Sequence, residues 1–175
     1  DWSSDVCSSD LMPASPTPLP EGYPDELPAV ELREWTRENY AMAFGLKLGE
    51  GQTEFVAENT ASLAQAHFHE EARPLGLFAG DLAVGFVMLS VEDVDKGVVW
   101  IWRFMIGAQH QRKGFGRQAV GAILEHARGM EGVETVKLCH VDKPGHPGPF
   151  YESLGFTYTG ELEDGERIMS LDLKD

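Results

Sequence analysis

The sequence predicts one α/β domain over residues 29–175. Strand-like apolar segments and helix-spaced apolar positions follow one another along it in the order β-α-α-β-β-β-α-β-α-β-β. The length of 175 residues is enough for one domain with a substantial core, and the hydrophobic share of 42% is ordinary for a globular protein. No internal repeat and no second domain are visible, so we expect one sheet with flanking helices.

The first half of the predicted domain contains a strand, two helices and a hairpin. Val30 and Leu32 alternate with polar residues, which is typical of a strand. Tyr40 and Phe44 are spaced as neighbours on one helix face. Gly80-Asp81 separates two strand-like segments and predicts a tight turn. We expect a strand at 29–35, a helix from about residue 36, a break at 49–53, a helix at 59–72, and hairpin strands at 73–79 and 82–90.

A long apolar strand and an amphipathic helix dominate the second half. Residues 98–106 are almost continuously apolar, so we expect both faces of this strand to be covered. Apolar residues recur at helical spacing from Ala119 to Ala127, and Gly129 is typical of a helix end. Asp164-Gly165 predicts a second hairpin turn. The other expected elements are a strand at 133–140, a short helix at 149–154, and strands at 156–161 and 167–173.

A basic turn with two glycines joins that strand to that helix, and it reads Gln111-Arg-Lys-Gly-Phe-Gly-Arg117. Glycine permits a positive φ and a close approach to the backbone. The first turn of the helix adds unpaired N–H groups and the positive end of the helix dipole. Such a turn suits a phosphate group, although a solvated basic turn beside an ordinary helix has the same composition. It matches neither the G-x-x-x-x-G-K-[ST] loop nor the G-x-G-x-x-G dinucleotide site.

The pattern Gln111-x-x-Gly114-x-Gly116 after a strand resembles the acetyl-CoA motif of the GNAT superfamily of N-acetyltransferases. This resemblance runs from about Val30 to the C-terminus. It implies a single-domain GNAT fold, with a mixed, mostly antiparallel sheet that splays between its fourth and fifth strands. Acetyl-CoA would place its pantetheine arm in the gap and its pyrophosphate on the turn. The coenzyme-binding residues that the resemblance implies are Phe104, Met105, Ile106, Gln111, Arg112, Lys113, Gly114, Phe115, Gly116 and Arg117.

The segment Pro149-Phe-Tyr-Glu-Ser-Leu-Gly-Phe156 resembles a second signature of the same family. In many members the tyrosine at the place of Tyr151 acts as a general acid and protonates the departing thiolate. A phenol with a pKa of about 10 can protonate a thiolate whose parent pKa is about 8.5, and it stays un-ionised at neutral pH. The alternative is a core tyrosine that packs beside Phe150 and Phe156.

The chain departs from the family pattern just before this tyrosine. Many members carry Asn five residues upstream, where this chain has His146 within Lys143-Pro-Gly-His-Pro-Gly-Pro149. Pro147 removes a backbone donor there, so the helix has to begin late. His146 is therefore either a replacement contact to the coenzyme or a loop residue without a role.

The stretches 101–117 and 52–66 most resemble the bacterial diamine and spermidine/spermine N-acetyltransferases. That resemblance implies a small-molecule amine as acceptor, a polyamine or diamine. The formal net charge of −15 agrees with a polycationic substrate. Trp102 and Arg103 stand where spermidine/spermine relatives carry acidic residues. The alternatives are another acceptor, such as an aminoglycoside, an amino acid or a protein N-terminus, and a non-catalytic acyl-CoA sensor.

No residue stands out as the general base that the acceptor amine needs. The candidate acids are Glu38, Glu70, Glu71, Glu92 and Asp93, and a water chain is the alternative. Trp100 and Trp102 lie on one side of the fourth strand, where they either line the acceptor pocket or simply pack. His67 and His69 lack the His-x-x-x-His spacing of a helical metal pair, so we expect no metal.

Charge and hydropathy argue against two classes of partner. The acidic balance argues against nucleic acid, and no apolar run is long enough to span a bilayer. The GNAT resemblance also allows a homodimer.

The N-terminal segments are expected to lie outside the domain. Residues 1–11 resemble the translation of a sequencing-adapter oligonucleotide, so we expect Met12 to be the true start. Residues 12–28 are rich in proline and predict a disordered leader. Without Cys7, the single Cys139 permits no internal disulfide, which agrees with a cytoplasmic setting.

Overall fold

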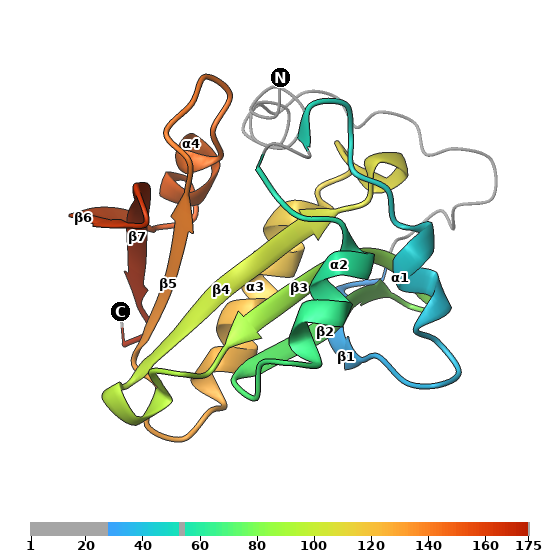
Figure 1. The fold of residues 1–175 in the computed structure, drawn as a ribbon, viewed down its shortest axis with the longest axis horizontal. Helices are drawn as coiled ribbons and strands as arrows, with labels where there is room; N and C mark the ends of the chain where they lie inside the picture. The colour runs from blue at the N-terminus through green and yellow to red at the C-terminus, as the bar shows by residue number, and fades with distance from the viewer. Residues whose placement is uncertain (1–27, 53–54, 175) are drawn as a thin grey trace.

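A computed structural model describes residues 28–52 and 55–174 of the chain. They form one seven-stranded sheet in the order β1-β2-β3-β4-β5-β7-β6 (Figure 1). Each strand expected from the sequence pattern is present, and the segments 1–11 and 12–27 lie outside the described residues. The strands are β1 (Val30–Glu34), β2 (Ala72–Ala79), β3 (Leu82–Ser90), β4 (Val98–Ile106), β5 (Thr135–His140), β6 (Thr157–Glu163) and β7 (Glu166–Asp172).

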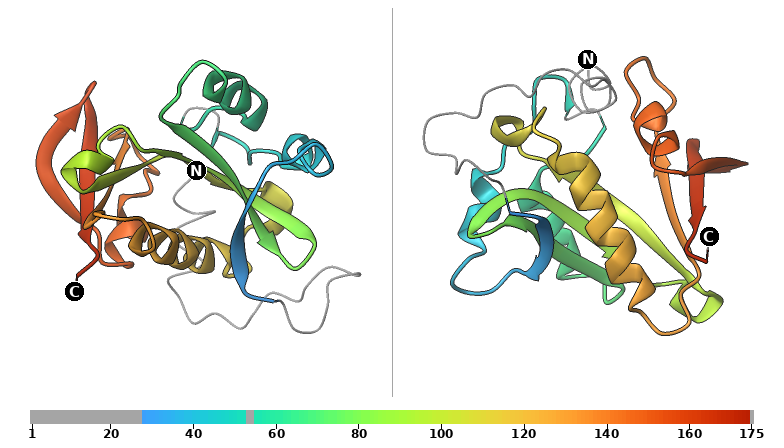
Figure 2. Two further views of the ribbon diagram at one scale, coloured as in Figure 1. Left: turned by 90° about the horizontal axis from the view of Figure 1, so that it is seen from below. Right: turned by 180° about the vertical axis from the view of Figure 1, so that it is seen from behind.

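Helices cover both faces of the sheet. Figure 2 shows α3 on one face and the pair α1 and α2 on the other. A large core cluster that includes Val120 and Ile123 of α3 lies on one face, and a smaller one that includes Phe86 and Met88 of β3 lies on the other. The helices are α1 (Ala41–Gly45), α2 (Asn59–Ala66), α3 (Phe115–Arg128) and α4 (Gly148–Glu152). The predicted mixed α/β architecture is confirmed.

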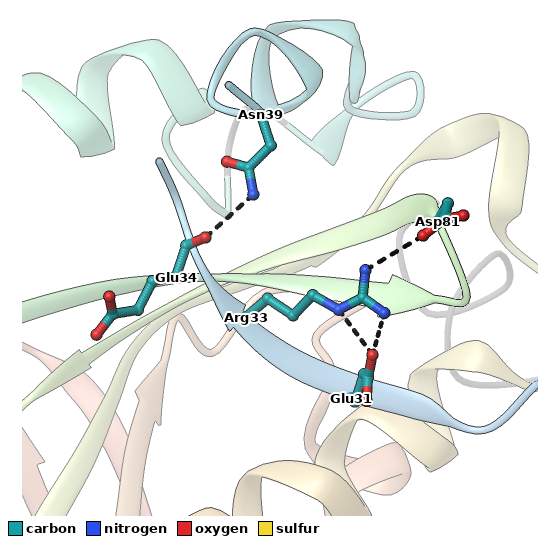
Figure 3. A network of polar contacts seen from close by, with 5 residues as sticks. All are labelled: Glu31, Arg33, Glu34, Asn39 and Asp81. Atoms are coloured by element: carbon teal, nitrogen blue, oxygen red, sulfur yellow. Dashed lines mark hydrogen bonds and ion pairs between the residues drawn. The ribbon is translucent and has the colours of Figure 1, made fainter. Parts of the chain in front are cut away.

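The two N-terminal helices are shorter than the sequence pattern predicts. Asn39 organises a turn before α1, because its side-chain Oδ1 accepts the Thr36 N–H at 2.7 Å. Its Nδ2 also donates to the Glu34 carbonyl at 3.2 Å (Figure 3). Figure 3 also shows Arg33 between Glu31 and Asp81, so that strand β1 is tied to the β2–β3 turn. These ion pairs are exposed and add little stability.

The prediction that the second helix continues to residue 72 is wrong. Helix α2 ends at Ala66, and Ala72 already pairs with Ser90 in the β2–β3 ladder. The helical pattern would bury Phe68, but this side chain is 79% exposed. Because the ladder begins at Ala72, the chain has to leave the helix earlier, and residues 67–71 form a turn. This turn carries His69 and Glu71.

Strand β4 separates from β5 half-way along its length. The two strands pair in parallel only from Val98–Thr135 to Ile101–Leu138, and the other neighbouring strands of the sheet pair antiparallel. Figure 1 shows β4 and β5 diverging beyond this point. The second half of β4 therefore has a hydrogen-bonded neighbour on its β3 side only. The splay that the family resemblance implied is present.

A β-bulge lies where the two strands separate. Met88 pairs with Arg103, but the next residue of β3, Leu89, pairs with Ile101, so Trp102 is the extra residue on β4. A bulge shifts the alternation of side chains by one position. Ile101 faces α3 before the bulge and Phe104 faces it afterwards. Trp102 packs instead against the cluster on the α2 face.

Candidate active site

The glycine-containing turn has the backbone geometry of an anion-binding site. Gly114 has φ +80° and Arg112 has φ +60°, and helix α3 begins directly after them at Phe115. The first amide with a helical partner is that of Gln118, which donates to the Gly114 carbonyl at 3.3 Å. The amides of residues 115–117 precede it, and no acidic residue lies in this first turn. The arrangement favours a phosphate at the N-terminus of α3.

Side chains hold this turn in place. Gln111 Nε2 donates to the Ile106 carbonyl at 2.9 Å and to Gln52 Oε1 at 3.0 Å, so this side chain braces the end of β4. Lys113 Nζ donates to the Gln109 carbonyl at 2.9 Å. Arg117 Nη2 lies 3.3 Å from the Ser153 hydroxyl, which follows α4. The structure thus brings the predicted turn residues together and links them to α4.

A cavity of about 520 Å³ opens between the separated strands. Of the predicted coenzyme residues, Phe104 lines it, whereas the turn at 111–117 lies beyond the end of β4. Tyr151 lines the same cavity from α4. The polar and aromatic side chains that line the cavity include His69, Glu71, Glu92, Asp93, Trp100, Trp102, Arg103, Cys139, His140, Tyr151, Glu163, Asp164 and Glu166.

Tyr151 packs in the core and also borders the cavity, so its position is compatible with either of the interpretations that the sequence left open. Its side chain is only 4% exposed, and its ring meets Phe150 and Phe156 edge-on at centroid distances of 5.2 and 5.5 Å. Packing on two sides restricts the phenol to one orientation, which a general acid requires.

Six carboxylates are among the described residues that line the cavity. Three of them, Glu71, Glu92 and Asp93, are among the predicted acids, whereas Glu38 and Glu70 are absent from the wall. The other three come from the β6–β7 hairpin, which the sequence marked only as a turn. Because β7 pairs with β5, the turn of this hairpin lies near the end of β5 and lines the same cavity as β4. They are Glu163, Asp164 and Glu166.

Hydrogen bonds and burial set the charges in this wall. Lys96 and the Trp100 indole hydrogen-bond to Asp93 and lower the pKa of its carboxyl. A backbone hydrogen bond and then the His69 ring lower the pKa of Glu71. Burial and the neighbouring Glu166 raise the pKa of the Cys139 thiol to about 12. At neutral pH the carboxylates of Asp93 and Glu71 are therefore ionised, and the thiol is neutral.

His146 contacts the protein rather than the cavity. Its Nδ1 accepts the Gly148 N–H at 3.1 Å, and its ring stacks on His140 at a centroid distance of 4.9 Å. His140 is 6% exposed and lines the cavity. Sequence reasoning missed His140, because a histidine at a strand end carries no motif.

The sequence pattern of the acetyltransferase (GNAT) family matches residues 29–156. The chain belongs to this family. This GNAT protein is an acetyl-CoA-dependent N-acetyltransferase, and acetyl-CoA is its cosubstrate. Within residues 28–52 and 55–174, no group of three metal-binding side chains is found, and no helix is long and apolar enough to cross a membrane.

Two curated relatives match most of this GNAT chain. They are the spermine/spermidine N(1)-acetyltransferase of Bacillus subtilis and a probable spermine N(1)-acetyltransferase of Bacillus subtilis subsp. natto. Each is 28% identical over 152 residues, which cover 83% of this chain and 99% of the relative.

Solved structures share the fold of the GNAT chain. An aminoglycoside acetyltransferase in complex with coenzyme A and kanamycin superposes with a TM-score of 0.68 at 20% identity, over 82% of this chain and 95% of the other. The spermidine N-acetyltransferase of Vibrio cholerae, in complex with CoA and spermine, superposes with a TM-score of 0.65 at 17% identity, over 83% and 96% of the two chains.

Proposed function

We propose that this enzyme transfers the acetyl group of acetyl-CoA to a primary amine of a polyamine or diamine. The observation that carries the proposal is the cavity that joins Tyr151 to six carboxylates. An elongated polycation needs several acidic contacts along its length, and this wall supplies them from two sides. Glu92 and Asp93 precede β4, and Glu163 and Glu166 lie across the cavity on the β6–β7 hairpin.

Aromatic side chains suit the same substrate. Trp100 and Trp102 line the cavity, and Trp100 Nε1 donates to Asp93 Oδ2 at 2.9 Å. Methylene segments of a polyamine pack on apolar surface, and ammonium groups are attracted to indole faces. The names of the two Bacillus relatives, which describe spermine and spermidine as acceptors, support this choice.

In the proposed reaction the amine attacks the thioester carbonyl directly, and Tyr151 is the general acid. The N-terminal amides of α3 and the turn at 111–117 would bind the pyrophosphate of acetyl-CoA. The backbone edge of Phe104, Met105 and Ile106, which lies beyond the last β4–β5 pair, would bind its pantetheine arm. The phenol of Tyr151, held by Phe150 and Phe156, then protonates the thiolate when the C–S bond breaks.

A thiol-release assay with acetyl-CoA tests the proposal. The full chain is assayed with spermine, spermidine, putrescine, an aminoglycoside, a set of amino acids and a peptide with a free N-terminus. We expect the highest kcat/KM with a polyamine or diamine. Preference for another acceptor contradicts the polyamine assignment. Tight binding of acetyl-CoA without transfer to any amine indicates an acyl-CoA sensor instead.

Arg103 favours a second candidate acceptor, an amine that also carries a carboxylate, such as an amino acid. Its guanidinium lines the cavity, and Nη1 donates to the Trp102 carbonyl at 2.9 Å. Among the described residues, no carboxylate lies within ion-pairing distance of this group, and burial lowers its pKa. Arginine recognises carboxylates in a bidentate manner, so the amino acids in the panel test this alternative.

A further inference from the structure

We propose that His69, oriented by Glu71, is the general base that removes a proton from the acceptor ammonium. The inference rests on the proposed function. An alkyl amine is almost fully protonated at neutral pH, as the lysine pKa of about 10.4 illustrates, and an ammonium group has no lone pair with which to attack a thioester. The enzyme therefore needs an acceptor for this proton, and the sequence patterns indicated no particular residue.

The geometry around His69 is that of a histidine–carboxylate pair. Its Nδ1 lies 2.7 Å from Glu71 Oε1. Because the Glu71 carboxylate is ionised, it accepts a hydrogen bond, and Nδ1 has to carry the proton. The lone pair of the neutral ring is then on Nε2. Among the described residues, none hydrogen-bonds to this atom. A carboxylate that fixes the tautomer and stabilises the imidazolium is the arrangement that supports histidine as a base.

His69 also lines the cavity that Tyr151 borders. Its ring meets the indole of Trp102 edge-on, at a centroid distance of 5.2 Å and an interplanar angle of 81°. Trp102 is the bulged residue at which β4 separates from β5, the point where the cavity between these strands begins. His69 and Tyr151 line this one cavity. The side chain of His69 is 41% exposed, so substrate or a single bridging water can reach Nε2.

The other charged groups of the cavity are compatible with this role. Glu92, Asp93, Glu163, Asp164 and Glu166 attract the acceptor ammonium into the cavity, and Arg103 is the one arginine among the lining residues. Glu71 is the carboxylate in contact with His69, so its charge stabilises the imidazolium that forms. The described residues that line the cavity include no lysine, and the cation that acts on the pair is Arg73 of β2, whose charge helps to lower the pKa of Glu71 and whose guanidinium donates to the Glu70 carbonyl.

The proton balance of the reaction is complete with these two residues. His69 Nε2 takes one proton from the ammonium, and the freed lone pair of the amine attacks the thioester carbonyl. The C–S bond of the tetrahedral adduct breaks, and the thiolate takes the phenol proton of Tyr151. The nitrogen, now an acetylated cation, returns its extra proton to the Tyr151 oxygen. His69 releases its proton to solvent, so one proton is produced for each acetyl group transferred.

The pH dependence of His69→Gln tests the assignment, with His67→Gln as the matched control. His67 is exposed, meets the Phe68 ring edge-on and is absent from the cavity wall. At neutral pH we expect kcat/KM of His69→Gln with spermidine to fall by at least about 100-fold. It should then rise about tenfold per pH unit, as the free amine becomes more abundant. His67→Gln should follow the wild type, and acetyl-CoA affinity should be unchanged in both variants.

A second comparison separates proton removal from packing. An acceptor amine whose conjugate acid has a pKa below the assay pH is already neutral, so His69→Gln should acetylate it at close to the wild-type rate. Glu71→Gln should lower kcat with spermidine, whereas Glu70→Gln, which lies outside the cavity wall, should not.

Each possible result supports or contradicts the assignment of His69 as the general base. Wild-type activity of His69→Gln at neutral pH overturns the inference, and so does an equal loss at every pH and with both kinds of amine, because that loss is structural. A wild-type enzyme that acetylates no amine overturns the proposed function, and the inference with it.

Discussion

The hydroxyl of Tyr158 lies 3.1 Å from Nε2 of His140 and joins strand β6 to the end of β5. His140 Nδ1 lies 3.0 Å from the Val141 carbonyl, so Nδ1 donates and Nε2 accepts from the phenol. The His140 ring also stacks on His146, whose Nδ1 accepts the Gly148 N–H at the start of α4. These contacts position the short helix that carries Tyr151.

This network predicts that acid destabilises the protein. Burial lowers the pKa of His140, and His146 and Arg167 act in the same direction, whereas Val141 and Asp142 oppose it. The unfolded chain therefore binds a proton near pH 6.5 that the folded chain binds only at lower pH. The stability present above about pH 6.5 should be lost as the pH falls toward the lowered pKa.

Urea unfolding at pH 7.5 and 5.5 checks this expectation. His140→Gln should show a smaller difference between the two pH values than the wild type. The exposed His126 on α3 gives the control, because His126→Gln should keep the wild-type difference. An unchanged pH dependence in His140→Gln contradicts the assignment.

Gly148→Ala should destabilise the protein and reduce activity. A Cβ at this position would collide with the Tyr158 hydroxyl and would lie 2.7 Å from His146 Nδ1. To accommodate the methyl group, α4 has to shift, and Tyr151 shifts with it. Such overpacking lowers the free energy of unfolding by about 1–3 kcal/mol. Thermal unfolding and kcat measure the two effects. Gly121→Ala in α3, where nothing lies within 4 Å of a Cβ, should instead gain about 0.5–1 kcal/mol.

Tyr151→Phe should lower kcat by about 10²–10⁴-fold, because it removes the proton that the leaving thiolate takes. The ring contacts with Phe150 and Phe156 remain, so acetyl-CoA affinity and unfolding temperature should change little. Steady-state kinetics and calorimetric titration with coenzyme A measure these quantities. Tyr40→Phe, at a side chain that is 47% exposed on the far face, is the control. Full activity of Tyr151→Phe would show that another group protonates the thiolate.

Gly114→Ala should weaken acetyl-CoA binding, whereas Gly132→Ala should not. Both glycines have a positive φ, +80° and +78°, and both have open space around a Cβ, so each substitution costs about 1–2 kcal/mol of backbone strain. Of the two, Gly114 lies at the N-terminus of α3, where the methyl group would meet the pyrophosphate if it binds at the proposed site. We expect a rise in Kd of about tenfold, equivalent to about 1.4 kcal/mol. Equal Kd values for the two variants would place the pyrophosphate elsewhere.

Local sequence patterns predicted the helices and strands well where the residues that determine an element all lie within that segment. The alternation and turn residues around Gly80-Asp81 and Asp164-Gly165 identified both hairpins, and β4 was predicted with its observed bounds. The end of α2 was predicted wrongly. Pairing between Ala72 and Ser90, which lie far apart in the sequence, decides where this helix has to stop. The bulge at Trp102 was missed for the same reason.

The sequence by itself determined the family, and it predicted a coenzyme turn at 111–117 and a role for Tyr151, because each prediction rests on a short motif whose residues are close in the chain. The tertiary structure decided the acceptor side. Glu92 and His69 come from two separate connections and Glu166 from the start of β7, and they line one cavity because β4 leaves β5. Side chains that line one cavity from distant segments have no fixed separation in the sequence, so no local sequence pattern predicts that they lie close together.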